Sequence, residues 1–280
     1  GSSNSNGDSF PNDFGFYIPI DNEYTAENDY FVKYANFAGA NAGYVVFFVN
    51  SDGPGDTGSF SEKRKSKTGT SSQAKYPLFI NDPDPDVWRS AVPPVWSYEP
   101  VFMKRVGEDG GKGLFTITVN TPCVIDILID LNGNQVKDGK DVILTHQFTA
   151  PGTIVLEWNG KDSDGTDVVP GTLVHFISSI AFFPVHFPIY DMEQSLGMVI
   201  KHMRPIRDNG DPVYDVLYWD DSNISESLAG GEPKSNTTGR STAPVSPGGN
   251  PVRQHRWHAT GNAGYSNNNT INTWTGAYNE

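Results

Sequence analysis

The sequence has little cysteine and little basic charge, and each shortage excludes a class of protein. Cys123 is the single cysteine among 280 residues, so no intrachain disulfide can form and a small disulfide-stapled fold is excluded. The 20 Lys and Arg residues stand against 33 Asp and Glu residues, which gives a net charge of −13. This charge argues against nucleic acid as a partner and disfavours anionic membranes, because both bind to a basic face.

Long uninterrupted apolar runs and amphipathic helical patterns are also absent. The most apolar stretch extends from Leu173 to Tyr190, but Pro184 and Pro188 interrupt it. Proline would break the hydrogen bonds of a membrane-spanning helix, so no membrane insertion is expected. The stretch instead predicts two strands with a bend at Phe183 and Pro184.

Sequence motifs of enzymes are missing as well. The chain contains no Gly-x-Ser-x-Gly sequence and no phosphate-binding loop, and its histidines do not have the spacing of a metal site. A glycosidase pair needs two opposed carboxylates about 5–10 Å apart. The adjacent Asp220 and Asp221 would project to opposite faces of a strand. We therefore predict no enzymatic activity, and we expect Cys123 to point into an apolar core.

Turn signals dominate what is present. The 29 Gly and 20 Pro residues separate short runs rich in Val, Ile, Phe and Tyr, which is typical of sandwiches. The predicted fold class is therefore all-β, with tandem antiparallel β-sandwiches and long loops. A polar, glycine-rich stretch near residues 100–112 suggests a domain boundary. The expected parts are a flexible linker at 1–13, a β-sandwich at 14–104, and a second sandwich with a long C-terminal excursion at 113–280.

The run DLNGNQVKDGKD has the spacing of a calcium loop. Five side-chain oxygen ligands fall at the first, third, fifth, ninth and twelfth places, and the backbone carbonyl of Val136 falls at the seventh. Calcium binds six to eight oxygens, and this spacing curls them around one point. The flanking VIDILI and VILTHQF alternate as strands do. The predicted Ca²⁺ ligands are Asp130, Asn132, Asn134, Val136, Asp138 and Asp141.

A turn without metal is the alternative for the same run. Gln135 occupies the place where an EF-hand loop has its glycine, and Asp141 replaces the longer Glu. Asn-Gly between apolar runs is also a strong hairpin signal by itself.

A second acidic cluster follows in WNGKDSDGTDVVPGT. Asp162, Asp164 and Asp167 surround Gly165 and could hold a second cation. The alternative is a hairpin, with turns at Gly165 and at Pro170-Gly171, and this alternative is favoured.

The tryptophans indicate carbohydrate binding as an alternative function. Calcium-bearing β-sandwiches include carbohydrate-binding modules, which present aromatic rings to sugars. Trp88, Trp96 and Trp257 are candidate glycan contacts. The alternative is that these rings pack in a core, since Trp buries a large apolar area.

The order of these motifs resembles a known group of proteins. The WNGKDSDGTDVVPGT hairpin is similar to one in the Ig-like domain of flagellar hook-capping proteins. The succession IDLNGNQV, WNGKD, PVHFPIYDMEQ, VLYWDDSN and HRWHATGN resembles Ig-like modules of large secreted surface adhesins and gliding-motility-associated proteins of the type IX secretion pathway. The resemblance covers residues 113–280. It implies an extracellular, calcium-binding, non-catalytic module for adhesion or gliding, which would contact neighbouring modules and a surface glycan or protein.

Overall fold

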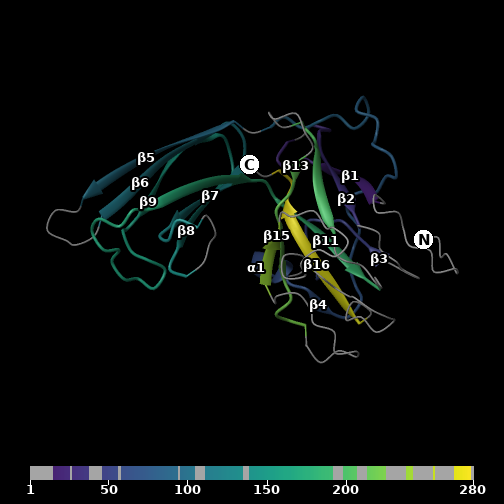
Figure 1. Ribbon diagram of the computed structural model, residues 1–280. Coiled ribbons are helices and arrows are strands. Elements are labelled where there is room, and N and C mark those ends of the chain that lie inside the picture. Colours follow the sequence, from purple (N-terminus) through teal and green to yellow (C-terminus); the bar gives the residue numbers. More distant parts are fainter. Residues whose placement is uncertain are drawn as a thin grey trace. The chain divides into compact units, whose positions relative to one another are not determined.

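The fold is all-β, as the sequence predicts (Figure 1). A computed structural model describes residues 15–25, 27–37, 46–55, 58–93, 95–104, 111–134, 139–191, 198–206, 213–224, 238–241, 255 and 268–278. Besides strands and loops, these residues contain one helix of four residues, α1 (Phe60–Lys63). None of these residues forms a helix long and apolar enough to cross a membrane. The expected linker at 1–13 lies outside the described residues.

The chain divides into two compact units, one of them discontinuous in sequence. The discontinuous unit comprises residues 1–92 and 184–277, and the inserted unit comprises residues 93–183 and 278–280. This division differs from the expected boundary near 100–112, because the strands on either side of residues 105–110 pair with each other. Hairpin loops and domain linkers share a polar, glycine-rich composition, so the sequence alone could not distinguish them.

The inserted unit consists of two three-stranded antiparallel sheets, in the orders β5-β6-β9 and β10-β7-β8. β5 is an edge strand, as its Pro100 requires. The six strands are β5 (Trp96–Lys104), β6 (Gly111–Val119), β7 (Cys123–Asp130), β8 (Val142–Phe148), β9 (Gly152–Trp158) and β10 (His175–Ala181).

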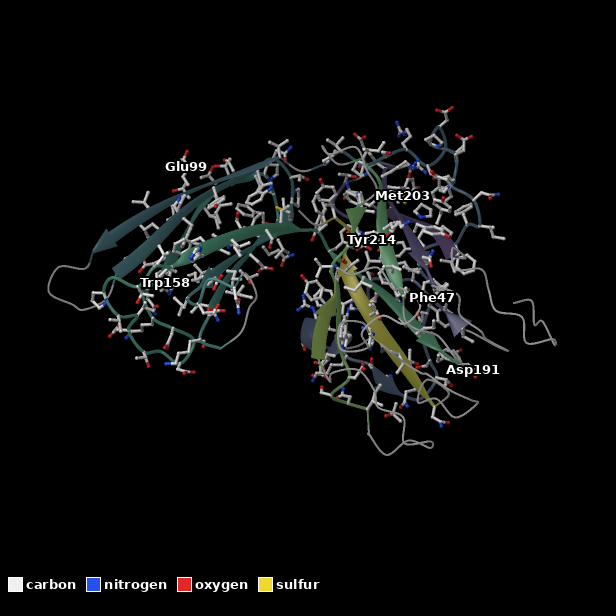
Figure 2. The ribbon with its side chains drawn as sticks, viewed as in Figure 1. Phe47, Glu99, Trp158, Asp191, Met203 and Tyr214 are labelled. Carbon is white, nitrogen blue, oxygen red and sulfur yellow. The ribbon has the colours of Figure 1, made fainter. Side chains whose placement is uncertain are left out.

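Strict alternation in β6 and β7 builds the core between these sheets. Every second residue is buried from Gly113 to Val119 and from Cys123 to Ile129, because successive side chains of a strand point to opposite faces. Phe176 of β10 contacts Phe115 of β6 (5.3 Å between centroids) and Trp158 of β9 (6.4 Å), so the two sheets pack face to face. Trp158 is labelled in Figure 2. Cys123 is buried in this core as expected, and burial raises the pKa of its thiol to about 11.

The discontinuous unit also contains two antiparallel sheets. One has the order β1-β2-β12-β13, and the other has the order β15-β14-β16-β11-β3 with β4 paired to β16. The strands are β1 (Gly15–Asp21), β2 (Tyr30–Asn36), β3 (Val46–Phe47), β4 (Lys67–Thr68), β11 (Pro184–Tyr190), β12 (Val199–Arg204), β13 (Val213–Tyr214), β14 (Leu217–Asp220), β15 (Thr238–Ser241) and β16 (Asn269–Gly276).

Aromatic rings join the two sheets of this unit. Phe47 of β3 contacts Phe16 of β1 at 6.3 Å, which defines the inner face of the first sheet. Residues two apart share a face, and cross-strand partners share it too. The register therefore adds Ile18, Ile20 and Phe31 to that inner face, and all three are fully buried.

The basic run after residue 62 is used inside the molecule. Lys63 pairs with Asp52, and Lys65 pairs with Glu62 at 2.8 Å. The Arg64 guanidinium lies 3.9 Å from the ring centroid of Trp274 in β16. Arg64 and the Ser66 amide, which donates to the Asp220 carbonyl at 2.8 Å, attach this segment to the second sheet of the discontinuous unit.

Candidate metal centre

The first and last predicted calcium ligands come together at the base of the loop between β7 and β8. Asp130 is the last residue of β7, and Asp141 directly precedes β8. Both carboxylates are removed from water, with 0% and 1% of their surfaces exposed. The Leu131 amide, next to Asp130, donates to Oδ1 of Asp141 at 2.8 Å. The chain thus returns to its starting point, as both the calcium-loop and the metal-free turn interpretations expect of a loop between two paired strands.

Backbone amides curl the first half of the loop around Asp130. Its Oδ1 accepts hydrogen bonds from the amides of Asn132 (3.2 Å) and Gly133 (2.7 Å). Oδ1 of Asn132 accepts in turn from the Asn134 amide at 3.0 Å. Gly133 has a φ of +76°, which the curl requires and glycine adopts without strain. The Asn-Gly pair therefore forms the curl of this loop.

Two buried carboxylates lie near one another at the base of this loop. An ionised carboxylate is costly to bury, and two of them near one another also repel. The amide donors reduce this cost but carry no full charge. A divalent cation at the mouth of the loop would offset both the desolvation and the repulsion.

The other predicted ligands are less enclosed or not described. Asn132 and Asn134 are exposed, whereas Val136 and Asp138 lie outside the described residues. Among the residues that the structure does describe, no group of three or more His, Cys, Asp or Glu side chains is placed to hold a metal. The described part of the site therefore contributes two carboxylates and two Asn side chains.

The second acidic cluster forms a hairpin turn and pairs with lysines. Oδ1 of Asp162 accepts from the amides of Asp164 (3.0 Å) and Thr166 (2.9 Å). Lys140 lies 2.9 Å from Asp162 and 3.7 Å from Asp164, and Lys161 lies 3.0 Å from Asp167. The Lys140 ammonium, followed by the backbone amides, holds the pKa of Asp162 below its usual value. These contacts support the turn interpretation over a second cation.

This hairpin also contacts the loop between β7 and β8. The Ser163 amide donates to the Lys140 carbonyl at 3.0 Å, and the Lys140 side chain reaches back to Asp162. Lys140 directly precedes Asp141. The hairpin therefore fixes the backbone that delivers the last predicted ligand.

The backbone of Gly160 in this hairpin packs closely against the backbone of Gly111 in β6. A Cβ at Gly160 (φ +78°) would lie 1.8 Å from the Gly111 carbonyl oxygen, whereas one at Gly165 (φ +80°) would meet nothing within 4 Å. Both alanine substitutions incur the positive-φ penalty of about 1–2 kcal/mol. We expect Gly160→Ala to lower the free energy of unfolding by more than Gly165→Ala, because only the first displaces a strand. Equal losses in urea titrations of the two variants would contradict this packing.

The tryptophans proposed for glycans are distributed over both units. Trp88 is half-buried in the discontinuous unit, where its ring packs on Tyr30 (4.8 Å) and Phe79 (5.3 Å). Trp96 is half-buried on the edge strand β5 of the inserted unit, stacked on Tyr98 at 5.9 Å. Trp257 lies outside the described residues. Trp88 thus packs within its own unit, and Trp96 with Tyr98 forms an aromatic pair on one strand.

A buried polar network around β16 was not predicted from the sequence. Ser66 donates to Oδ1 of Asp221 (2.6 Å), and Nε2 of His255 lies 3.0 Å from the other carboxylate oxygen. Nδ1 of His255 lies 2.7 Å from Oγ1 of Thr273, and the ring stacks on Trp219. Ser66 contacts the carboxylate and not the imidazole, so this is not the order of a nucleophilic triad. The Thr and Asn residues of NTINTW were its only signal.

Comparison with known proteins adds no assignment. No family model matches the chain, and no curated protein or solved structure matches it.

Proposed function

We propose that this chain is a calcium-stabilised, non-catalytic extracellular module of a bacterial cell-surface adhesin. It would support adhesion or gliding as part of a longer exported protein, in line with its resemblance to Ig-like modules of the type IX pathway. The observation that carries the proposal is the pair of buried carboxylates, Asp130 and Asp141, at the two ends of one loop.

A bound calcium ion would stabilise this pair of buried carboxylates. The β7–β8 loop closes one end of a sandwich, and a cation there ties two strands of one sheet together. Extracellular calcium is commonly millimolar, and extracellular modules bind it with dissociation constants of about 10⁻⁴–10⁻³ M. The site would then be filled outside the cell and largely empty at intracellular calcium levels. The net charge of −13 is compatible with binding divalent cations.

Antibody labelling tests the proposed location. We expect antibodies raised against this chain to label intact cells that produce it, because the module is exposed outside the cell. Deletion of the parent gene is expected to impair attachment or surface movement. Antibody against a cytoplasmic protein is the control for cell integrity. Labelling only after lysis, or turnover of a polysaccharide or peptide by the purified chain, would overturn the proposal.

A carbohydrate-binding module is the second candidate, and the Trp96–Tyr98 pair favours it. The two rings lie two residues apart on β5, stacked with an interplanar angle of 18°. Such a pair on an edge strand can lie against a sugar ring. A glycan array, with and without calcium, tests this function. Binding that is lost in Trp96→Ala and kept in Trp88→Ala would establish it, whereas an array without signal would leave the adhesin module as a structural element.

A further inference from the structure

One lysine lies in the apolar interior of the discontinuous unit. Lys33 is in the middle of β2, opposite Ile18 of β1 and His202 of β12. The register places it on the inner face, together with Ile18, Ile20 and Phe31. None of its side-chain surface is exposed. Lysine is almost never fully buried without a partner.

Its partner is a carboxylate that is equally removed from water. Nζ of Lys33 lies 2.5 Å from Oδ2 of Asp215, whose side chain is also 0% exposed. The Asp215 amide donates to the Ile200 carbonyl of β12 at 2.9 Å, so the backbone holds this carboxylate beside β2. Both reacting groups are thus fixed in contact by sheet structure. Such fixation converts a reaction between two molecules into a much faster one within a single molecule.

We propose that Lys33 and Asp215 condense to form an intramolecular amide bond. The Lys33 ammonium first transfers one proton to the Asp215 carboxylate, and the lone pair of the resulting amine attacks Cγ of Asp215 to form a carbon–nitrogen bond. One carboxylate oxygen leaves, and it takes two of the three ammonium protons with it as water. The ion pair already contains every atom of the product, so no oxidant, nucleotide or other reactant is needed.

The buried environment favours the amide over the ion pair. Two charges that are removed from water incur a desolvation penalty that can exceed their attraction. Condensation replaces both charges with one neutral amide. It also releases water from a site with no exposed surface, which opposes the reverse hydrolysis. This argument depends on Lys33 and Asp215 alone, and it holds whether or not the calcium proposal is correct.

The bond would join two distant parts of the chain. Lys33 and Asp215 are 182 residues apart in sequence, and each belongs to a different segment of the discontinuous unit. Asp215 lies between β13 of the first sheet and β14 of the second. The amide would therefore fasten the first sheet to the connection that leads to the second, and the inserted unit would lie within a covalently closed loop.

Intact mass spectrometry of the denatured full chain tests the proposal. The expected mass is lower than the sequence mass by one water molecule, and a tryptic digest should contain one branched peptide that joins Lys33 to Asp215. Lys33→Met and Asp215→Ala should both have their full sequence masses. A wild-type chain that keeps its full mass after prolonged incubation in the folded state overturns the proposal, even if neither variant folds.

Water loss elsewhere gives a different pattern. Asp-Gly steps such as Asp52-Gly53 and Asp164-Gly165 can lose water by cyclisation within the backbone. That loss would persist in Lys33→Met and would yield no branched peptide, and this result counts against the amide. Formation of the branched peptide in the Asp130→Ala variant as well would show that it does not require the calcium loop.

Discussion

Removal of calcium is expected to lower the melting temperature of the inserted unit by about 5–10 °C. A site filled at about ten times its dissociation constant adds about 1.4 kcal/mol to the free energy of unfolding. A domain of about 90 residues shifts by about 4–8 °C for each kcal/mol, and partial occupancy reduces the shift. The physical cause is the repulsion and desolvation of Asp130 and Asp141, which the cation offsets. Differential scanning calorimetry in excess calcium and in excess chelator measures the shift.

Two alanine variants locate the site. Asp130→Ala removes a buried charged ligand and should abolish the response to chelator. Asp164→Ala is the matched control, because Asp164 is an exposed carboxylate of the adjacent hairpin. We expect it to cost only about 1 kcal/mol and to keep the calcium response. The reverse pattern would move the metal to the hairpin.

A third variant separates charge from turn structure. Asp130→Asn keeps an oxygen that can accept the amides of Asn132 and Gly133, but it removes the negative charge. The loop should therefore still curl, whereas calcium affinity should fall. Unchanged melting in chelator, combined with no metal in elemental analysis of the wild-type chain, would rule out the site.

The strands were predictable from the sequence because one face of each is apolar. In CVIDILID the alternation predicted both the strand and its inner face, and Cys123, Ile125, Ile127 and Ile129 are fully buried. Alternation is a local property, so it could be read without knowing which strands pair.

The division into units was not predictable in the same way. β11 follows the inserted unit in sequence but pairs with β3 from the first fifty residues. Nothing local in PVHFPIY records a partner that far away. The proposed calcium loop was found because its ligands are close in sequence, whereas Ser66, Asp221 and His255 are far apart. Only the folded structure brings such residues together.

Acidification is expected to destabilise the discontinuous unit through His186. The imidazole is fully buried in β11, and its Nδ1 lies 3.0 Å from Nδ2 of Asn272. The amide nitrogen donates, so Nδ1 accepts and the proton is on Nε2. Nε2 has no hydrogen-bond partner among the described residues. Burial, together with the nearby Arg64 charge, lowers the pKa of His186 to about 3.

The direction of the effect follows from which state binds the proton. In the unfolded chain a histidine takes up a proton below about pH 6.5, whereas folded His186 stays neutral until about pH 3. Between these values the unfolded state binds more protons, so stability falls as the pH falls. The slope rises to about 1.4 kcal/mol per pH unit, and the loss amounts to about 2 kcal/mol between pH 6.5 and pH 4.5.

His186→Asn isolates this contribution from the titration of carboxylates. Its side-chain oxygen can still accept from Asn272, but the group no longer titrates. The variant should lose stability at pH 7 from the smaller side chain, and its stability should fall less steeply with acidification than that of the wild type. His175→Asn, at an exposed imidazole of the inserted unit, is the control and should keep the wild-type slope of the discontinuous unit. Urea unfolding from pH 7 to 4.5 in saturating calcium measures the slopes. Parallel slopes for wild type and His186→Asn would show that His186 is protonated in the folded state.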